Sequence, residues 1–79
     1  MCDKLTIAET VDATGLTCPL PLLKAKQGLK SLRSGECLKV LATDPGSERD
    51  FEVFANLSGN SLVQLEKIGD TFTYVLQKI

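Results

Sequence analysis

Apolar residues alternate with polar ones in two short segments, and this period of two predicts β-strands. Residues 8–13 form the first such segment and residues 36–43 the second. In each segment one face is expected to be buried and the other to be polar. The side chains predicted on the two buried faces are Val11, Ala13, Leu38, Val40 and Ala42.

Two other segments repeat their apolar residues every three or four positions, the period of an amphipathic helix. Pro19 suits the first position of the first helix, because a proline lacks the N–H that would stay unpaired there, and Gly35 is the predicted stop. The second helix is predicted to start with Asp44 as its N-cap, followed by Pro45, and to end at Gly59. The predicted buried stripes are Leu22, Ala25, Leu29 and Leu32, then Phe51, Phe54 and Ala55.

The last part of the chain is typical of a β-hairpin. Residues 61–68 and 71–79 are rich in strand-forming side chains, and Gly69-Asp70 supplies a two-residue turn between them. Right-handed crossovers then place both helices on one face of a mixed four-stranded sheet. We predict a single α+β domain over residues 1–79, a two-layer β-α-β-α-β-β sandwich whose residues 1–6 are loose. The order of the strands in the sheet stays open.

Charge and hydrophobicity argue against two classes of binding partner, nucleic acids and membranes. Nine basic and ten acidic side chains give a net charge of −1, so no overall field attracts nucleic acid and no direct nucleic-acid contact is expected. No stretch reaches the roughly 20 apolar residues of a membrane span, and the first residues lack a signal-peptide pattern. Three cysteines at these spacings match neither a disulfide framework nor a metal motif. We expect a reduced cytoplasmic protein with no bound metal and no membrane partner.

The absence of histidine removes the usual base of Ser-His-Asp and Cys-His nucleophile systems. No glycine-rich phosphate loop is present, so no cofactor-binding residues are predicted. What remains is Cys18 at a helix start, where backbone N–H groups and the helix dipole are expected to lower the thiol pKa, with Lys26 as a weaker contributor. Helix position alone favours a structural cysteine over a reactive one. Cys37 is read as structural and partly covered, and Cys2 as incidental.

A basic stripe accompanies the apolar face of the first predicted helix. Lys26, Lys30 and Arg33 extend from the Cys18 end at helical spacing and offer docking points for an acidic partner. On spacing alone, a solvated surface is the commoner interpretation of such a stripe.

The segment Gly15-Leu16-Thr17-Cys18-Pro19-Leu20-Pro21 resembles the TusA family of sulfur carriers, also called SirA-like. The hallmark of that family is Cys-Pro-x-Pro after a strand that ends in Asp-x-x-Gly-Leu, and this lead-in is residues 12–16 here. The resemblance extends from about residue 8 to the end of the chain. It continues through Gly35-Glu36, Asp44-Pro45, Arg49-Asp50 and Gly59-Asn60-Ser61-Leu62.

The resemblance implies a function. Family members carry sulfane sulfur as a persulfide on the motif cysteine, without another cofactor, so Cys18 would be the sulfur-bearing residue. They accept the sulfur from a donor such as a cysteine desulfurase or a rhodanese-like protein and pass it to an acceptor protein. We therefore expect a monomeric sulfurtransferase of the carrier kind, in tRNA thiolation, molybdenum-cofactor or sulfur-oxidation pathways. Motif support is expected from Gly15, Leu16, Pro19 and Pro21, and partner binding from Lys26, Lys30, Asp44 and Arg49. The helical spacing of the basic stripe adds Arg33 to the expected partner-binding residues.

Two other functions stay open from the sequence. A thiol redox or regulatory protein could act through disulfide formation by Cys18, although no resolving cysteine lies nearby in the sequence. A non-enzymatic RNA-binding or regulatory module is the other alternative. The slight acidic balance and the four aromatic residues count against it.

Overall fold

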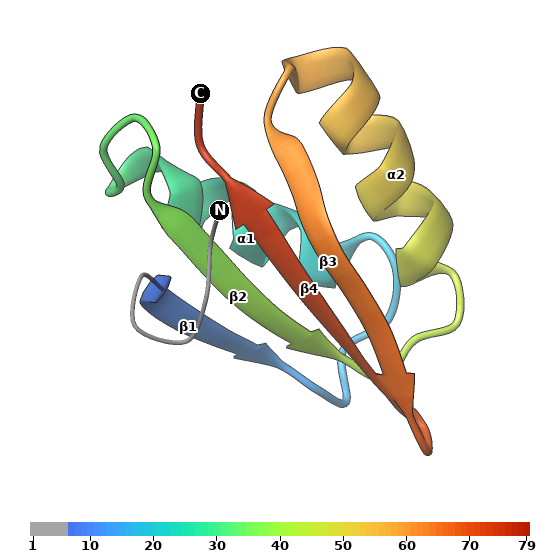
Figure 1. Cartoon of the computed structure of the whole chain (residues 1–79). Coiled ribbons are helices and arrows are strands. Elements are labelled where there is room, and N and C mark those ends of the chain that lie inside the picture. Colours follow the sequence, from blue (N-terminus) through green and yellow to red (C-terminus); the bar gives the residue numbers. More distant parts are fainter. Residues whose placement is uncertain (1–6) are drawn as a thin grey trace.

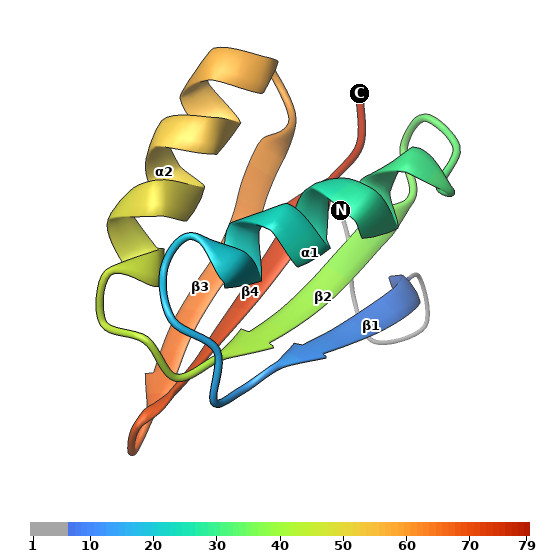
Figure 2. The same ribbon diagram turned by 180° about the vertical axis from the view of Figure 1, so that it is seen from behind.

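Strands and helices alternate in the predicted order in the computed structural model, which describes residues 7–79. Figures 1 and 2 show the four strands as one layer and both helices together on one of its faces. The predicted α+β sandwich with a mixed sheet is therefore confirmed. The expectations for residues 1–6 and for Cys2 lie outside the described residues. The elements are β1 (Ile7–Ala13), α1 (Leu20–Lys30), β2 (Cys37–Ala42), α2 (Ser47–Ser58), β3 (Ser61–Ile68) and β4 (Thr71–Gln77).

The sheet has the strand order β1-β2-β4-β3, which the sequence left open. β1 and β2 are parallel, whereas β4 is antiparallel to both of its neighbours. Ala13 pairs with Ala42, so β1 and β2 end side by side at one edge of the sheet. The loops that follow these strands, residues 14–19 and 43–46, therefore leave the sheet next to each other (Figure 2).

The core between sheet and helices confirms the periodicity argument. The residues predicted to be buried in β2 are fully buried, and those of α1 and α2 are buried or packed at the core margin. At its centre the Phe51 ring of α2 stacks on the Tyr74 ring of β4, with centroids 4.2 Å apart and planes 6° apart. This stack anchors the first half of α2 to the sheet. The buried core members are Ala13, Ala25, Leu29, Leu32, Leu38, Val40, Ala42, Phe51, Phe72, Tyr74 and Leu76.

Helix α1 ends earlier than predicted, at Lys30 rather than near Gly35. The chain tightens at this point, because both the N–H and the hydroxyl of Ser31 donate to the carbonyl oxygen of Gly28. The Lys78 ammonium group then donates to the main-chain oxygens of Leu29 and Leu32, at 2.7 and 2.8 Å. A contact with the C-terminal segment thus sets the end of α1. The spacing of apolar residues along the helix carries no information about such a contact.

Gly28 allows α1 to lie close to the sheet. A Cβ atom at this position would lie 3.1 Å from Cδ1 of Leu38 and 3.3 Å from Cγ2 of Val11, tighter than ordinary van der Waals contact. A glycine inside a helix costs roughly 1 kcal/mol relative to alanine. Here glycine has that cost but allows α1, the helix that follows Cys18, to pack closely against the sheet.

Cys37 is fully buried in β2 and disulfide-bonded, so the predictions that it is partly covered and that the protein is fully reduced were wrong. Among residues 7–79, neither helix has the length and apolar character of a membrane span.

Candidate functional site at Cys18

The candidate nucleophile lies on the loop between β1 and α1. Cys18 is exposed and its thiol is free. The loop is held at its start by Gly15, which adopts a positive φ of 80° and donates its N–H to Oγ1 of Thr43 at 2.9 Å. Thr43 follows β2, so this bond ties the Cys18 loop to the neighbouring parallel strand.

The other motif residues shape the path into α1. Leu16 packs against the core, and Pro21 is fully buried in the first turn of the helix. The helix begins at Leu20, so Pro19 is its N-cap rather than its first residue, and Cys18 precedes the cap. The peptide bond between Cys18 and Pro19 is cis. The predicted supporting residues therefore flank Cys18 in the loop and the first helical turn, and Cys18 lies directly beside the N-cap, within the predicted placement.

A second loop approaches Cys18 from the start of α2. The main-chain N–H of Cys18 donates to Oδ2 of Asp44 at 3.2 Å. This corrects the prediction for Asp44: Gly46 is the N-cap of α2, no side chain caps that helix, and the Asp44 carboxylate faces the Cys18 loop instead. A Cβ at Gly46 would lie 3.0 Å from Asp44 Oδ2 and 3.7 Å from the Cys18 Cβ, so glycine leaves room for both loops.

The sulfur itself contacts an acidic side chain. Cys18 Sγ donates a hydrogen bond to Oδ2 of Asp50, on the first turn of α2. This bond raises the pKa of the Cys18 thiol above its ordinary value, with smaller contributions from lost solvation and from the negative charges of Asp50 and Asp44. The predicted depression of the pKa by the helix start was therefore wrong. A full negative charge in contact with the sulfur outweighs the roughly half charge of a helix terminus.

A groove between the two helices opens beside this acidic contact. Its volume is about 410 Å³, and Asp50 forms part of its wall. The Lys26 ammonium group lies over the Phe54 ring in the same groove, 5.5 Å from the ring centroid. The groove thus combines an apolar floor with charges of both signs. Its side chains include Leu22, Lys26, Arg49, Asp50, Val53, Phe54 and Leu57.

Comparison with known proteins assigns this arrangement to a family. The family model for the sulfurtransferase TusA matches residues 9–78. The sulfur carrier protein TusA of Allochromatium vinosum is 46% identical over 70 residues, which cover 89% of this chain and 92% of that protein. This chain belongs to the TusA family.

Two further comparisons agree with the family. The sulfur carrier protein TusA of Pseudomonas putida is 43% identical over 68 residues, covering 86% of this chain and 85% of that protein. The crystal structure of a SirA-like protein from Desulfitobacterium hafniense superposes with a TM-score of 0.76 at 28% identity. It covers 87% of this chain and 95% of that chain. Membership in the TusA family indicates sulfur transfer and a sulfur-carrier role, and with it interactions with sulfur donor and acceptor proteins.

The structure separates the predicted partner-binding residues into two groups. Asp44 touches Cys18, and Lys26 and Arg49 line the groove that Asp50 shares. Lys26 also lines, together with Lys30, a smaller hollow of about 280 Å³ toward the C-terminal end of α1. Arg33 lies beyond the end of α1, where its main-chain N–H donates to Oε1 of Glu36 at 2.6 Å. Lys26 and Lys30 therefore lie on one side of α1 as predicted, whereas Arg33 lies off the helix and outside the predicted stripe.

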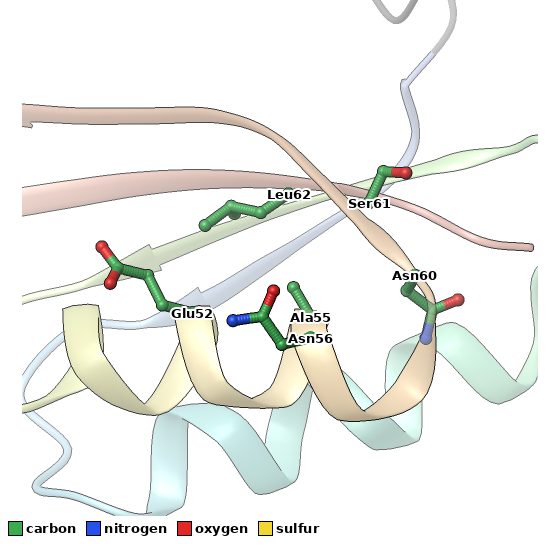
Figure 3. A pocket seen from close by; sticks show the side chains of 6 residues that line it. All are labelled: Glu52, Ala55, Asn56, Asn60, Ser61 and Leu62. Atoms are coloured by element: carbon green, nitrogen blue, oxygen red, sulfur yellow. The ribbon is translucent and has the colours of Figure 1, made fainter.

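Asp50 is the residue that the reasoning from sequence did not place in the site. It occurs in the Arg49-Asp50 pair that resembles the TusA family, but the sequence predicts no contact between Asp50 and Cys18. Its contact with Cys18 depends on β1 and β2 being adjacent, and the sequence did not determine that order. A further hollow of about 450 Å³ lies between α2 and the start of β3, and Glu52, Asn56 and Leu62 are among its lining residues (Figure 3).

Proposed function

We propose that Cys18 carries sulfane sulfur as a persulfide, taken from a donor such as a cysteine desulfurase or a rhodanese-like protein. The carrier then passes the sulfur to an acceptor protein in tRNA thiolation, molybdenum-cofactor or sulfur-oxidation pathways. The observation that carries this proposal is the free, exposed thiol of Cys18 on a loop held by its motif residues. We further propose that the protein acts as a cytoplasmic monomer and binds proteins rather than nucleic acid or membrane.

The proposed exchange needs no substrate pocket, because the reacting sulfur atoms are presented by two proteins. The sulfur of Cys18 attacks the outer sulfur of a donor persulfide, R–S–SH, while the S–S bond of the donor breaks. The products are the Cys18 persulfide and the donor thiol, R–SH, which keeps the proton count balanced. Delivery to an acceptor thiol repeats this exchange in the opposite direction, with no external oxidant or reductant.

Sulfur uptake by each cysteine can be measured separately. Trypsin releases Cys18 on peptide 5–24, apart from Cys2 in residues 1–4 and from the disulfide-bonded Cys37 in residues 34–39. After incubation with a cysteine desulfurase and cysteine, we expect a gain of about 32 Da, one sulfur atom, on peptide 5–24, reversed by reduction. Sulfur found on the other two peptides and absent from 5–24 would contradict the proposal.

We propose that partner proteins dock over the groove and the adjoining basic side chains. Lys26 and Arg49 would contribute most, because they line the groove beside the sulfur site. Lys30 and Arg33 would contribute less, because they lie toward and beyond the far end of α1. Asp44 would act at the edge of the Cys18 loop. Acidic side chains on the donor would complement the two groove cations.

Charge reversal tests this docking surface. Lys26→Glu with Arg49→Glu should slow sulfur uptake from the donor protein about tenfold or more, because attraction becomes repulsion. Wild-type transfer should weaken as salt rises, as expected for screened charges. Arg33→Glu is the matched control, with a smaller expected effect. Equal rates for the double variant and wild type, with urea unfolding unchanged, would show that these cations do not guide docking.

A further inference from the structure

We propose that Asp50 restrains the Cys18 thiol until a sulfur donor brings a positively charged side chain to the Asp50 carboxylate. This inference rests on the proposed function, in which Cys18 accepts the sulfur. It adds a condition on the donor: a lysine or arginine must lie close to the sulfur that the donor delivers. Asp50 would then select donors by charge as well as control the reactivity of the carrier.

The contact that carries the proposal is the hydrogen bond from Cys18 Sγ to Oδ2 of Asp50. Asp50 is held in place by α2, because its N–H donates to the Gly46 carbonyl oxygen at 3.3 Å and the next residue, Phe51, is fully buried. The main-chain N–H of Cys18 also donates to Oδ2 of Asp44 at 3.2 Å. Cys18 therefore lies between two carboxylates on elements that the core fixes in position.

This arrangement favours the thiol over the thiolate. A carboxylate that accepts the S–H hydrogen bond stabilises the neutral form, and its charge repels a neighbouring thiolate. The thiolate is the form that attacks sulfur, so the free carrier should react slowly with small electrophiles. This protects an exposed cysteine from side reactions while no donor is bound.

A cation from a donor would reverse both effects. By pairing with Asp50 it would neutralise the charge beside the sulfur and compete with the thiol for the carboxylate oxygens. The Cys18 proton would leave as the S–S bond of the donor breaks, and it would end on the departing donor thiolate. The charged groups around this contact are Asp44, Asp50, Lys26 and Arg49, and the last two line the groove from α1 and α2.

The first test uses a neutral alkylating agent, iodoacetamide, and follows peptide 5–24 by mass spectrometry. The Asp50→Asn variant should react several-fold faster than wild type at pH 7, and its pH profile should move to lower pH. The sign follows from the lost carboxylate: a lower Cys18 pKa leaves more thiolate at a given pH. Asp50→Glu keeps the carboxylate and should stay close to wild type. Glu48→Gln, on the same turn of α2, is the matched control and should leave the profile unchanged.

The second test measures charge selection. A cationic and an anionic methanethiosulfonate are compared on the same cysteine. Wild type should favour the cationic reagent, and the ratio of the two rates should fall several-fold in Asp50→Asn but not in Glu48→Gln. If Asp50→Asn does not fold, Asp44→Asn replaces it, with a smaller change in the same direction.

An unchanged or slower alkylation profile in Asp50→Asn, or an equal shift in Glu48→Gln, would overturn the proposal. So would an unchanged ratio of the two charged reagents. Because neither test involves sulfur transfer, these outcomes are independent of whether Cys18 accepts sulfur. Failure of the proposed function would appear in the sulfur-uptake measurement on peptide 5–24 instead.

Discussion

Replacing Cys18 with serine is expected to reduce transferable sulfur to background. A serine hydroxyl has nearly the same shape, but it ionises far too weakly to attack a persulfide and cannot form one. Cys18 is exposed on its loop, so the fold should be preserved and the stability change should stay within about 0.5 kcal/mol. Labelled sulfur from a cysteine desulfurase, released by reduction, is the measurement.

Cys37→Ala is the matched variant for this experiment. Cys37 is fully buried in β2 and disulfide-bonded, so its replacement changes the core and removes that disulfide but leaves the exposed thiol of Cys18 in place. We expect sulfur uptake by Cys37→Ala to remain near wild type once its folded fraction has been checked. If Cys18→Ser retained sulfur uptake and Cys37→Ala lost it, the assignment of the chemistry to Cys18 would be wrong.

Much of the fold could be predicted because β2, β4 and the two helices bury side chains at regular intervals. A single core contains the alternating strand residues Leu38, Val40 and Ala42. It also contains Ala25 and Leu29, which repeat at helical spacing. The hairpin followed from Gly69-Asp70, since a two-residue turn joins the strands directly. Such patterns are local, and local patterns can be read without knowing which strands are neighbours.

The electrostatics of the site could not be predicted in the same way. The helix start suggested a low pKa for Cys18, but Asp50 lies 32 positions further along the chain and reaches the sulfur only because the sheet places β2 beside β1. Asp44 is a similar case. Its sequence context is typical of a helix cap, yet its carboxylate accepts the N–H of Cys18. In both cases a tertiary contact replaced the local interaction that the sequence suggested.

The position of Asp50 also links the chemistry of the site to the core. The residue that follows it, Phe51, stacks on Tyr74, and the Tyr74 hydroxyl lies 2.7 Å from the hydroxyl of Ser47 at the start of α2. Ser47 Oγ in turn lies 2.7 Å from the main-chain oxygen of Asp44. Both carboxylates beside Cys18 are therefore positioned through one buried cluster.

Phe51→Ala should accordingly be the most destabilising single change considered for this chain. Removing a fully buried phenylalanine costs about 3–5 kcal/mol, a large share of the roughly 5–15 kcal/mol that small domains possess. Urea unfolding followed by circular dichroism measures the loss. Leu57→Ala is the control on the same helix, because Leu57 is 84% exposed and its replacement should change stability by no more than about 0.5 kcal/mol. Equal midpoints for the two variants would mean that the Phe51–Tyr74 stack does not hold α2, and with it Asp50, against the sheet.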